Sequence, residues 1–126
     1  MRELLAVVVG SLVGTALRFG LDMAIPHTDV GFPFSTLLIN IVGSFALGVM
    51  VARVWAIVPA WTKAGLGPGL LGTFTTFSAF AVSLVTLTAG GQIGLAVVYL
   101  VASLGGGFLA AFAGLRLGRR SREVPK

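Results

Sequence analysis

Three long apolar stretches dominate this chain of 126 residues: Leu4–Ala24, Phe34–Val58 and Ile93–Leu117. Each is long enough to cross the hydrocarbon core of a bilayer, which takes about 20 predominantly apolar residues in a helix. A fourth apolar stretch, between Trp61 and Thr88, is interrupted by the glycine- and hydroxyl-rich segment Gly69–Phe80. The sequence therefore predicts an all-α membrane protein with four transmembrane helices, of which the third is broken.

The interruption is informative because backbone freed of its helical hydrogen bonds is costly at membrane depth. It is tolerated only where protein groups or a water-lined cavity satisfy the freed N–H and C=O groups. Thr75, Thr76 and Ser78 lie in the segment, and their hydroxyls can cap such groups. The freed carbonyls of Gly72 and Thr75 could instead coordinate a small hard cation, for which carbonyl oxygen is a suitable ligand. Residue spacing alone leaves both interpretations open.

The composition excludes several other classes of protein. The chain is 56% hydrophobic and only 10% charged, whereas a soluble domain carries roughly 25% charged residues. It has no cysteine, which excludes disulfides and thiol chemistry, and its lone histidine, His27, falls in an expected loop. No nucleophile–base pair or metal-ligand cluster is evident, so no enzyme is predicted. No Asp, Glu, Lys or His lies centrally in a span, so a proton-coupled carrier would lack its usual intramembrane carboxylate.

Proline and glycine signals set the expected bounds of the helices. We expect helices at Glu3–Ala24, Pro33–Val58, Trp61–Thr88 and Gln92–Gly118. A loop is expected at Pro26–Gly31 and a tight turn at Gly90–Gly91. The chain then divides into a four-helix transmembrane domain, residues 1–118, and a basic tail, residues 119–126.

The cationic residues are distributed unevenly between the two sides of the predicted bundle. Both termini and the connection between the second and third helices share one side, which carries eight of them: Arg2, Arg53, Lys63, Arg116, Arg119, Arg120, Arg122 and Lys126. The other side has only Arg18, inside the first helix. This bias predicts that both termini lie in the cytoplasm. The basic tail is expected at anionic lipid headgroups rather than on nucleic acid.

Polar residues form one face on two of the helices. Thr36, Asn40 and Ser44 recur every fourth residue on the second helix, and Asn40 cannot face lipid cheaply. It can either join two helices by a hydrogen bond or line a pore. On the fourth helix, Tyr99 and Ser103 repeat the pattern, although Tyr99 could also be an interfacial anchor.

Two phenylalanines and one charged pair allow similar alternatives. Phe77 and Phe80 are three residues apart, so they point the same way; this spacing is typical of packing. Their ring edges carry partial positive charge and, if turned into a pore, would suit an anion. Arg18 and Asp22, one turn apart, are expected to neutralise each other in a structural role.

Small residues recur on every helix and allow backbones to approach closely. Packing within one subunit would use some of these small residues. The others would be free to contact a second subunit, so an oligomer is predicted. The glycines concerned are Gly10, Gly14, Gly43, Gly48 and Gly105–Gly107.

Three motifs together resemble the small fluoride channel family, the CrcB or Fluc proteins. The segment Gly69–Phe80 is similar to the signature of the family's broken third helix. Ser35–Phe45 resembles its second-helix motif, and Gly10-x3-Gly14-x3-Arg18-Phe19 resembles its first. The resemblance covers about residues 5 to 115.

The resemblance implies a fluoride-selective channel in the plasma membrane (the inner membrane in a two-membrane cell) that exports fluoride passively and protects against its toxicity. It implies an antiparallel dimer with two fluoride pathways and a central sodium ion held by the carbonyls of Gly72 and Thr75. The residues that it places along each pathway are Asn40, Thr76, Phe77, Ser78, Phe80, Tyr99 and Ser103. Four positions depart from the family pattern, namely Ser11 and Thr73 for glycines, Ala79 for threonine and Gly107 for serine. The last puts that end of the polar track in doubt.

Two further functions and two assemblies stay open at this point. The functions are a small multidrug-type proton-coupled exporter, which would need a membrane-embedded glutamate, and a non-conducting partner subunit. The assemblies are a homodimer and a pair with an oppositely oriented paralogue. The second is suggested by the eight-to-one split of the cationic residues, since an antiparallel homodimer needs copies inserted both ways.

Overall fold

The computed structural model describes residues 1–25 and 31–120, and within these ranges it contains helices but no strands. The elements are α1 (Arg2–Ala24), α2 (Phe34–Arg53), α3 (Ala60–Ala64), the π-helix η1 (Gly65–Leu71), α4 (Gly72–Phe74), α5 (Phe77–Ala89) and α6 (Ile93–Arg120). Four stretches are long and apolar enough to cross a membrane: Arg2–Ala24, Phe34–Arg53, Ala60–Ala89 and Ile93–Arg120. The prediction of an all-α, multi-pass membrane protein is thus confirmed. Residues 26–30 of the expected loop, with His27, and the tail beyond Arg120 lie outside the described residues.

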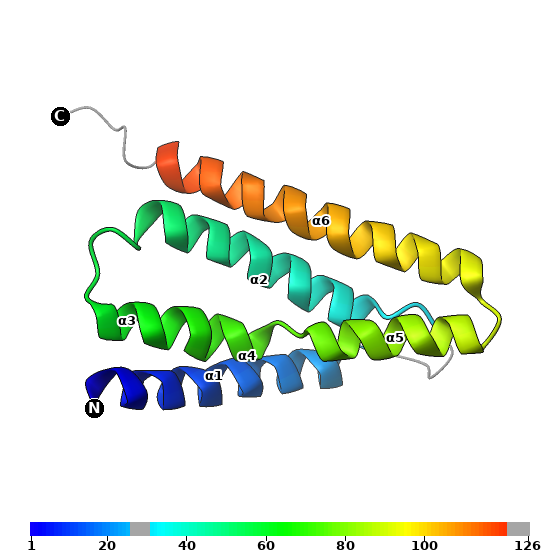
Figure 1. Cartoon of the computed structure of the whole chain (residues 1–126), viewed down its shortest axis with the longest axis horizontal. Coiled ribbons are helices and arrows are strands. Elements are labelled where there is room, and N and C mark those ends of the chain that lie inside the picture. The colour runs from blue at the N-terminus through cyan, green and yellow to red at the C-terminus, as the bar shows by residue number, and fades with distance from the viewer. Residues whose placement is uncertain (26–30, 121–126) are drawn as a thin grey trace.

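The four spans lie side by side, with α2 between α6 and the third span (Figure 1). The third span runs from α3 through η1 and α4 to α5, and α1 lies along its other side (Figure 1). The N-terminal end of α1, the connection between α2 and α3, and the C-terminal end of α6 are found at the same end of the bundle. The described members of the predicted cationic cluster therefore lie at one end of the bundle, and Arg122 and Lys126 lie outside the described residues.

The contact between α2 and α6 is the most extensive in the molecule, and glycines allow it. A Cβ atom built on Gly48 would collide with the carbonyl oxygen of Ala111, and one on Gly114 would collide with that of Phe45. Between α1 and the third span, a Cβ built on Gly10 would likewise collide with the carbonyl oxygen of Gly65. Close backbone approach of this kind holds helices together where no hydrophobic drive acts between them.

Two helix ends differ from the sequence prediction by more than one residue. The second helix ends at Arg53 rather than near Val58, because the Trp55 N–H bonds back to the Met50 carbonyl and closes the helix. The Trp55 ring then packs over Gly67 of η1. The last helix continues past Gly118 to Arg120, since Gly118 packs against Ala52 and Val49 of α2 instead of ending the helix.

The third span changes its conformation twice along its length. In η1 it contains Pro68, which lacks an N–H and crowds the preceding turn. The wider π-helical turn accommodates it, and the Gly72 N–H bonds to the Gly67 carbonyl five residues back. Further along, Thr75 (φ −77°, ψ 157°) and Thr76 (φ −146°, ψ 119°) are extended. The helices α4 and α5 are therefore not continuous.

A small cluster of buried side chains, which includes two aromatic rings, lies where α5 meets α6. Phe80, Leu87, Ala96 and Tyr99 are buried together. Tyr99 is 0% exposed, and its ring packs against that of Phe80 with centroids 5.5 Å apart. Tyr99 therefore sits inside the bundle rather than on its outer surface. The turn at Gly90–Gly91 is formed as predicted, with Gly91 at a φ of 75°.

Candidate functional site

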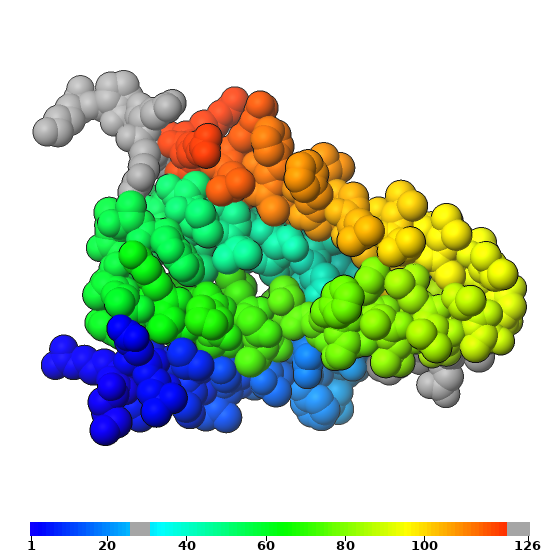
Figure 2. Space-filling model, viewed as in Figure 1, coloured from blue at the N-terminus to red at the C-terminus, as the bar shows by residue number. Residues whose placement is uncertain are grey.

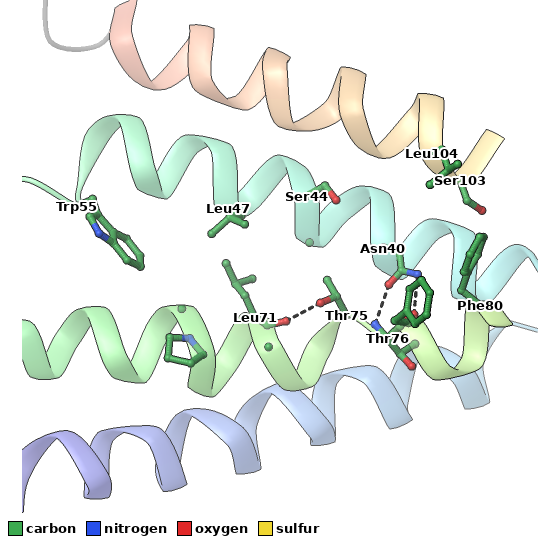
Figure 3. A pocket seen from close by; sticks show the side chains of 15 residues that line it. Asn40, Ser44, Leu47, Trp55, Leu71, Thr75, Thr76, Phe80, Ser103 and Leu104 are labelled. Atoms are coloured by element: carbon green, nitrogen blue, oxygen red, sulfur yellow. Dashed lines mark hydrogen bonds between the residues drawn. The ribbon is translucent and has the colours of Figure 1, made fainter. Parts of the chain in front are cut away.

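Asn40 of α2 joins its helix to the extended pair Thr75–Thr76. Its Oδ1 accepts a hydrogen bond from the Thr76 N–H at 2.8 Å, and its Nδ2 donates to the Thr76 carbonyl at 3.0 Å (Figure 3). One carboxamide thus satisfies both backbone groups of a residue that has left the helix. This is the helix-joining role that the sequence allowed. A carboxamide has two N–H donors, so one remains for another acceptor.

The threonine hydroxyls complete the capping of this segment. Thr76 Oγ1 accepts from the Ala79 N–H at 3.1 Å and so caps the N-terminus of α5. It also lies 3.1 Å from Ser78 Oγ. Thr75 Oγ1 donates to the Leu71 carbonyl at 2.9 Å. Asn40 and these hydroxyls supply much of the bonding that the interrupted helix loses.

The same bonds leave two carbonyls without their usual helical donors. In a continuous helix, the Thr76 N–H would bond to the Gly72 carbonyl and the Ala79 N–H to the Thr75 carbonyl. Here those N–H groups bond to Asn40 and to Thr76 Oγ1 instead. The partial negative charge of helical carbonyls and the partial positive charge of the α5 N-terminus meet at this point.

A cavity of about 520 Å³ opens beside the interruption. Figure 2 shows the molecule hollowed between α2 and the third span, and Figure 3 shows the side chains around the hollow. Seven predicted site residues line this cavity, namely Asn40, Gly72, Thr75, Thr76, Phe77, Phe80 and Ser103, and so does Gly43. A Cβ on Gly43 would collide with Cγ2 of Thr75, so glycine there lets α2 reach the interruption.

The two phenylalanines share the cavity but differ in burial. Their ring centroids are 5.7 Å apart. Phe80 is 8% exposed and packs on Tyr99, whereas Phe77 is 79% exposed. A large apolar side chain with that exposure, at the edge of an open cavity, marks a surface that lipid or another subunit covers.

A group of hydroxyls lies around that of Tyr99. Thr36, Ser83 and Ser103 approach the Tyr99 hydroxyl. Within the described residues, however, neither Tyr99 Oη nor Ser103 Oγ has a hydrogen-bond partner of acceptable geometry. Buried polar atoms are nearly always paired. Sequence reasoning missed Ser83, although its position one turn after Phe80 on the same helix face could have indicated it.

A second cavity, of about 880 Å³, lies between α1 and α5. Ser78 lines this cavity rather than the first, together with Arg18 and Asp22. The expected Arg18–Asp22 pairing is not what the structure shows. In the part of the chain that it describes, the hydrogen bond to the Asp22 carboxylate comes from Ser35 Oγ at 2.7 Å. Ser35 lies at the start of α2, so the bond ties the end of α1 to the next span.

Comparison with known proteins identifies relatives along almost the whole chain. The family model for CrcB-like proteins (Camphor Resistance, CrcB) matches residues 5–115. A protein named fluoride-specific ion channel FluC 2, from Geobacillus kaustophilus, is 41% identical over 125 residues, which cover 94% of this chain and 95% of that one. Proteins named fluoride-specific ion channel FluC from Thermus thermophilus and Paracoccus denitrificans are each 37% identical. Those matches cover 94% and 91% of this chain, and 96% and 93% of the relatives.

Proposed function

The chain belongs to the CrcB family, and from this premise we propose that it is a fluoride-selective ion channel that exports fluoride from the cytoplasm. The single observation that carries the proposal is the 41% identity, over 94% of the chain, to a protein named fluoride-specific ion channel. Its curated relatives are ion channels and not enzymes.

The chemistry of the first cavity supports this function. Fluoride is small and strongly hydrated, so a selective route must replace its water with hydrogen-bond donors. One N–H of Asn40 donates to the Thr76 carbonyl, and its second N–H is available. Ser103 adds a hydroxyl without a partner in the described residues. The rings of Phe77 and Phe80 add positive edges. Their position beside the cavity supports the proposed pathway.

The absence of ionisable groups at mid-membrane suits a passive route. Neutral HF crosses lipid and dissociates in a more alkaline cytoplasm, which traps the anion. A negative-inside potential then drives export with roughly 2.3 kcal/mol per elementary charge per 100 mV. No residue that couples flux to protons is needed. The multidrug-type exporter would need a carboxylate near the middle of a span, and no Asp or Glu lies there.

The channel is proposed to be an antiparallel dimer with both termini of this chain in the cytoplasm. One subunit alone leaves the first cavity open along its side (Figure 2). It also leaves Phe77 79% exposed at the edge of that cavity. A second subunit would cover both. The partner is either an identical chain or an oppositely oriented paralogue, as the uneven distribution of cationic residues suggests.

We further propose a sodium ion at the carbonyls of Gly72 and Thr75. These are the carbonyls whose helical donors are diverted to Asn40 and Thr76, and carbonyl oxygen is a fitting ligand for a hard cation. Among the described residues no group of three His, Asp or Glu side chains could hold a metal, so backbone oxygens are the natural donors. When bound, the ion would supply positive charge beside the anion route.

Fluoride efflux from liposomes tests the proposed function. Purified protein is reconstituted into liposomes loaded with potassium fluoride, valinomycin is added to balance charge, and released fluoride is measured with an electrode. A channel discharges the liposomes rapidly without a proton gradient, and chloride-loaded liposomes keep their contents. Efflux that requires a proton gradient would indicate an exporter. No efflux from a correctly folded protein would indicate a non-conducting subunit.

A further inference from the structure

Thr73 of α4 makes a hydrogen bond that leaves its own span. Its Oγ1 lies 3.1 Å from the carbonyl oxygen of Ser11 in α1. It also lies 2.8 Å from the carbonyl oxygen of Gly69 and 3.3 Å from that of Leu70. A hydroxyl has one proton to donate. The Thr73 hydroxyl proton is therefore shared between a carbonyl of α1 and carbonyls in the last turn of η1.

The two helices touch at the same point. A Cβ built on Gly14, one turn after Ser11, would collide with both the Leu70 carbonyl oxygen and Thr73 Oγ1. Gly14 is also the one buried residue of α1 among those that the structure describes. The hydroxyl therefore occupies a notch between Ser11 and Gly14, where even a methyl group on α1 would displace it.

This contact holds a short element that continues η1 and packs mainly on α1. The helix α4 is three residues long, and it lies between a π-helix and the extended residue Thr75. It contacts α1 far more than it contacts α2. Its first residue is Gly72, and Thr75 follows its last. A shift of α4 along α1 would therefore move both residues at the wall of the first cavity.

We propose that Thr73 is a positioning residue, whose hydroxyl anchors α4 to α1 and thereby sets the height of Gly72 and Thr75 along the cavity. Thr73 does not line that cavity, so it acts through its neighbours. The inference rests on the proposed function and adds to it. Thr73 is one of the four positions at which this sequence departs from the pattern of the resemblance, so the resemblance does not imply the anchor.

Three variants separate anchoring from simple packing. Thr73→Val keeps the shape but removes the hydroxyl, and Thr73→Ser keeps the hydroxyl. Thr88→Val is the matched control, because Thr88 Oγ1 bonds back to the Leu84 carbonyl at 2.7 Å on an exposed face of α5 and, within the described part of the chain, to no other helix. Each variant is purified with the wild type, and its elution volume and thermal unfolding are recorded.

Fluoride efflux is compared per unit of correctly assembled protein. Thr73→Val is expected to lower the rate by at least about tenfold, since misplacement of a positioned group by an ångström is costly. Thr73→Ser is expected within about threefold of wild type, because the hydrogen bond can re-form. Thr88→Val is expected within about twofold, as for other surface changes. Unchanged flux in Thr73→Val, or an equal loss in Thr73→Ser, would overturn the inference.

Hydrogen–deuterium exchange supplies a readout that does not depend on conduction. Faster exchange across residues 69–76 is expected in Thr73→Val, but not in Thr73→Ser or Thr88→Val. Equal exchange in all of these proteins would contradict the anchor. If the wild type does not conduct, the proposed function fails while the exchange comparison still decides whether Thr73 holds α4 in place.

Discussion

At the scale of single residues, the interruption of the third span depends on side chains that replace backbone bonds. Asn40 satisfies both backbone groups of Thr76, and Thr76 in turn caps α5. The sequence indicated that Asn40 needs a polar environment at membrane depth. It could not indicate which atoms Asn40 meets, because the contact joins residues 36 positions apart and depends on how two spans pack.

Phe80→Ile tests the aromatic side of the cavity. The ring of Phe80 lies between those of Phe77 and Tyr99, at centroid distances of 5.7 and 5.5 Å. An isoleucine fills similar space but offers no positive ring edge. We expect fluoride efflux to fall by about 100-fold or more, as for loss of a preorganised electrostatic contact, while the elution volume stays unchanged.

Phe108→Ile is the matched control for that substitution. Phe108 is 74% exposed on α6, and it lines neither cavity. Its replacement should leave efflux within about twofold of wild type. Equal efflux in Phe80→Ile and Phe108→Ile would show that Phe80 serves packing alone.

At the scale of elements, hydropathy located all four spans because about 20 apolar residues are needed to cross a bilayer. The helix ends were harder to predict. The end of α2 at Arg53 reflects the packing of Trp55 over Gly67, a tertiary contact. In the sequence, Thr73 and Ser11 stood out only because each replaces a glycine of the pattern that the chain resembles. Their hydrogen bond required the structure, since it joins residues 62 positions apart.

Gly114→Val tests the packing of α2 on α6. A Cβ at Gly114 would collide with the Phe45 carbonyl oxygen, whereas a Cβ at Gly105 would meet no other helix of the described chain within 4 Å. We expect Gly114→Val to lower the free energy of unfolding by about 2 kcal/mol and Gly105→Val to change it by less than about 0.5 kcal/mol. Thermal unfolding in detergent measures both. Equal midpoints would contradict the proposed contact, and a larger loss in Gly105→Val would place an interface at that position.

At the scale of the whole molecule, the open side of one subunit and the eight-to-one distribution of cationic residues point in different directions. In the proposed dimer a second subunit would cover the open side, whereas the charge bias favours a single orientation. A homodimer would need copies of this chain inserted in both orientations, whereas a pair with a paralogue would keep this chain in one orientation. The sequence alone does not decide between them, because either proposed assembly would place a second subunit on the open side of this chain.

Orientation mapping distinguishes the two assemblies. The chain has no cysteine, so a single cysteine in place of Lys126 can be labelled from either side of the membrane when the protein is expressed alone. A homodimer predicts labelling from both sides and conduction without a partner. A strict pair with a paralogue predicts labelling from one side and no conduction until the partner is added.

The central claim is that the interruption at Thr75–Thr76, bridged by Asn40, serves a fluoride route. Fluoride efflux from liposomes containing Asn40→Asp tests it most directly. The carboxylate keeps an acceptor for the Thr76 N–H but loses the donor to the Thr76 carbonyl, and it places negative charge in the cavity. We predict loss of efflux by about 100-fold or more in a protein that still elutes with the wild type. Wild-type efflux in correctly assembled Asn40→Asp would contradict the account.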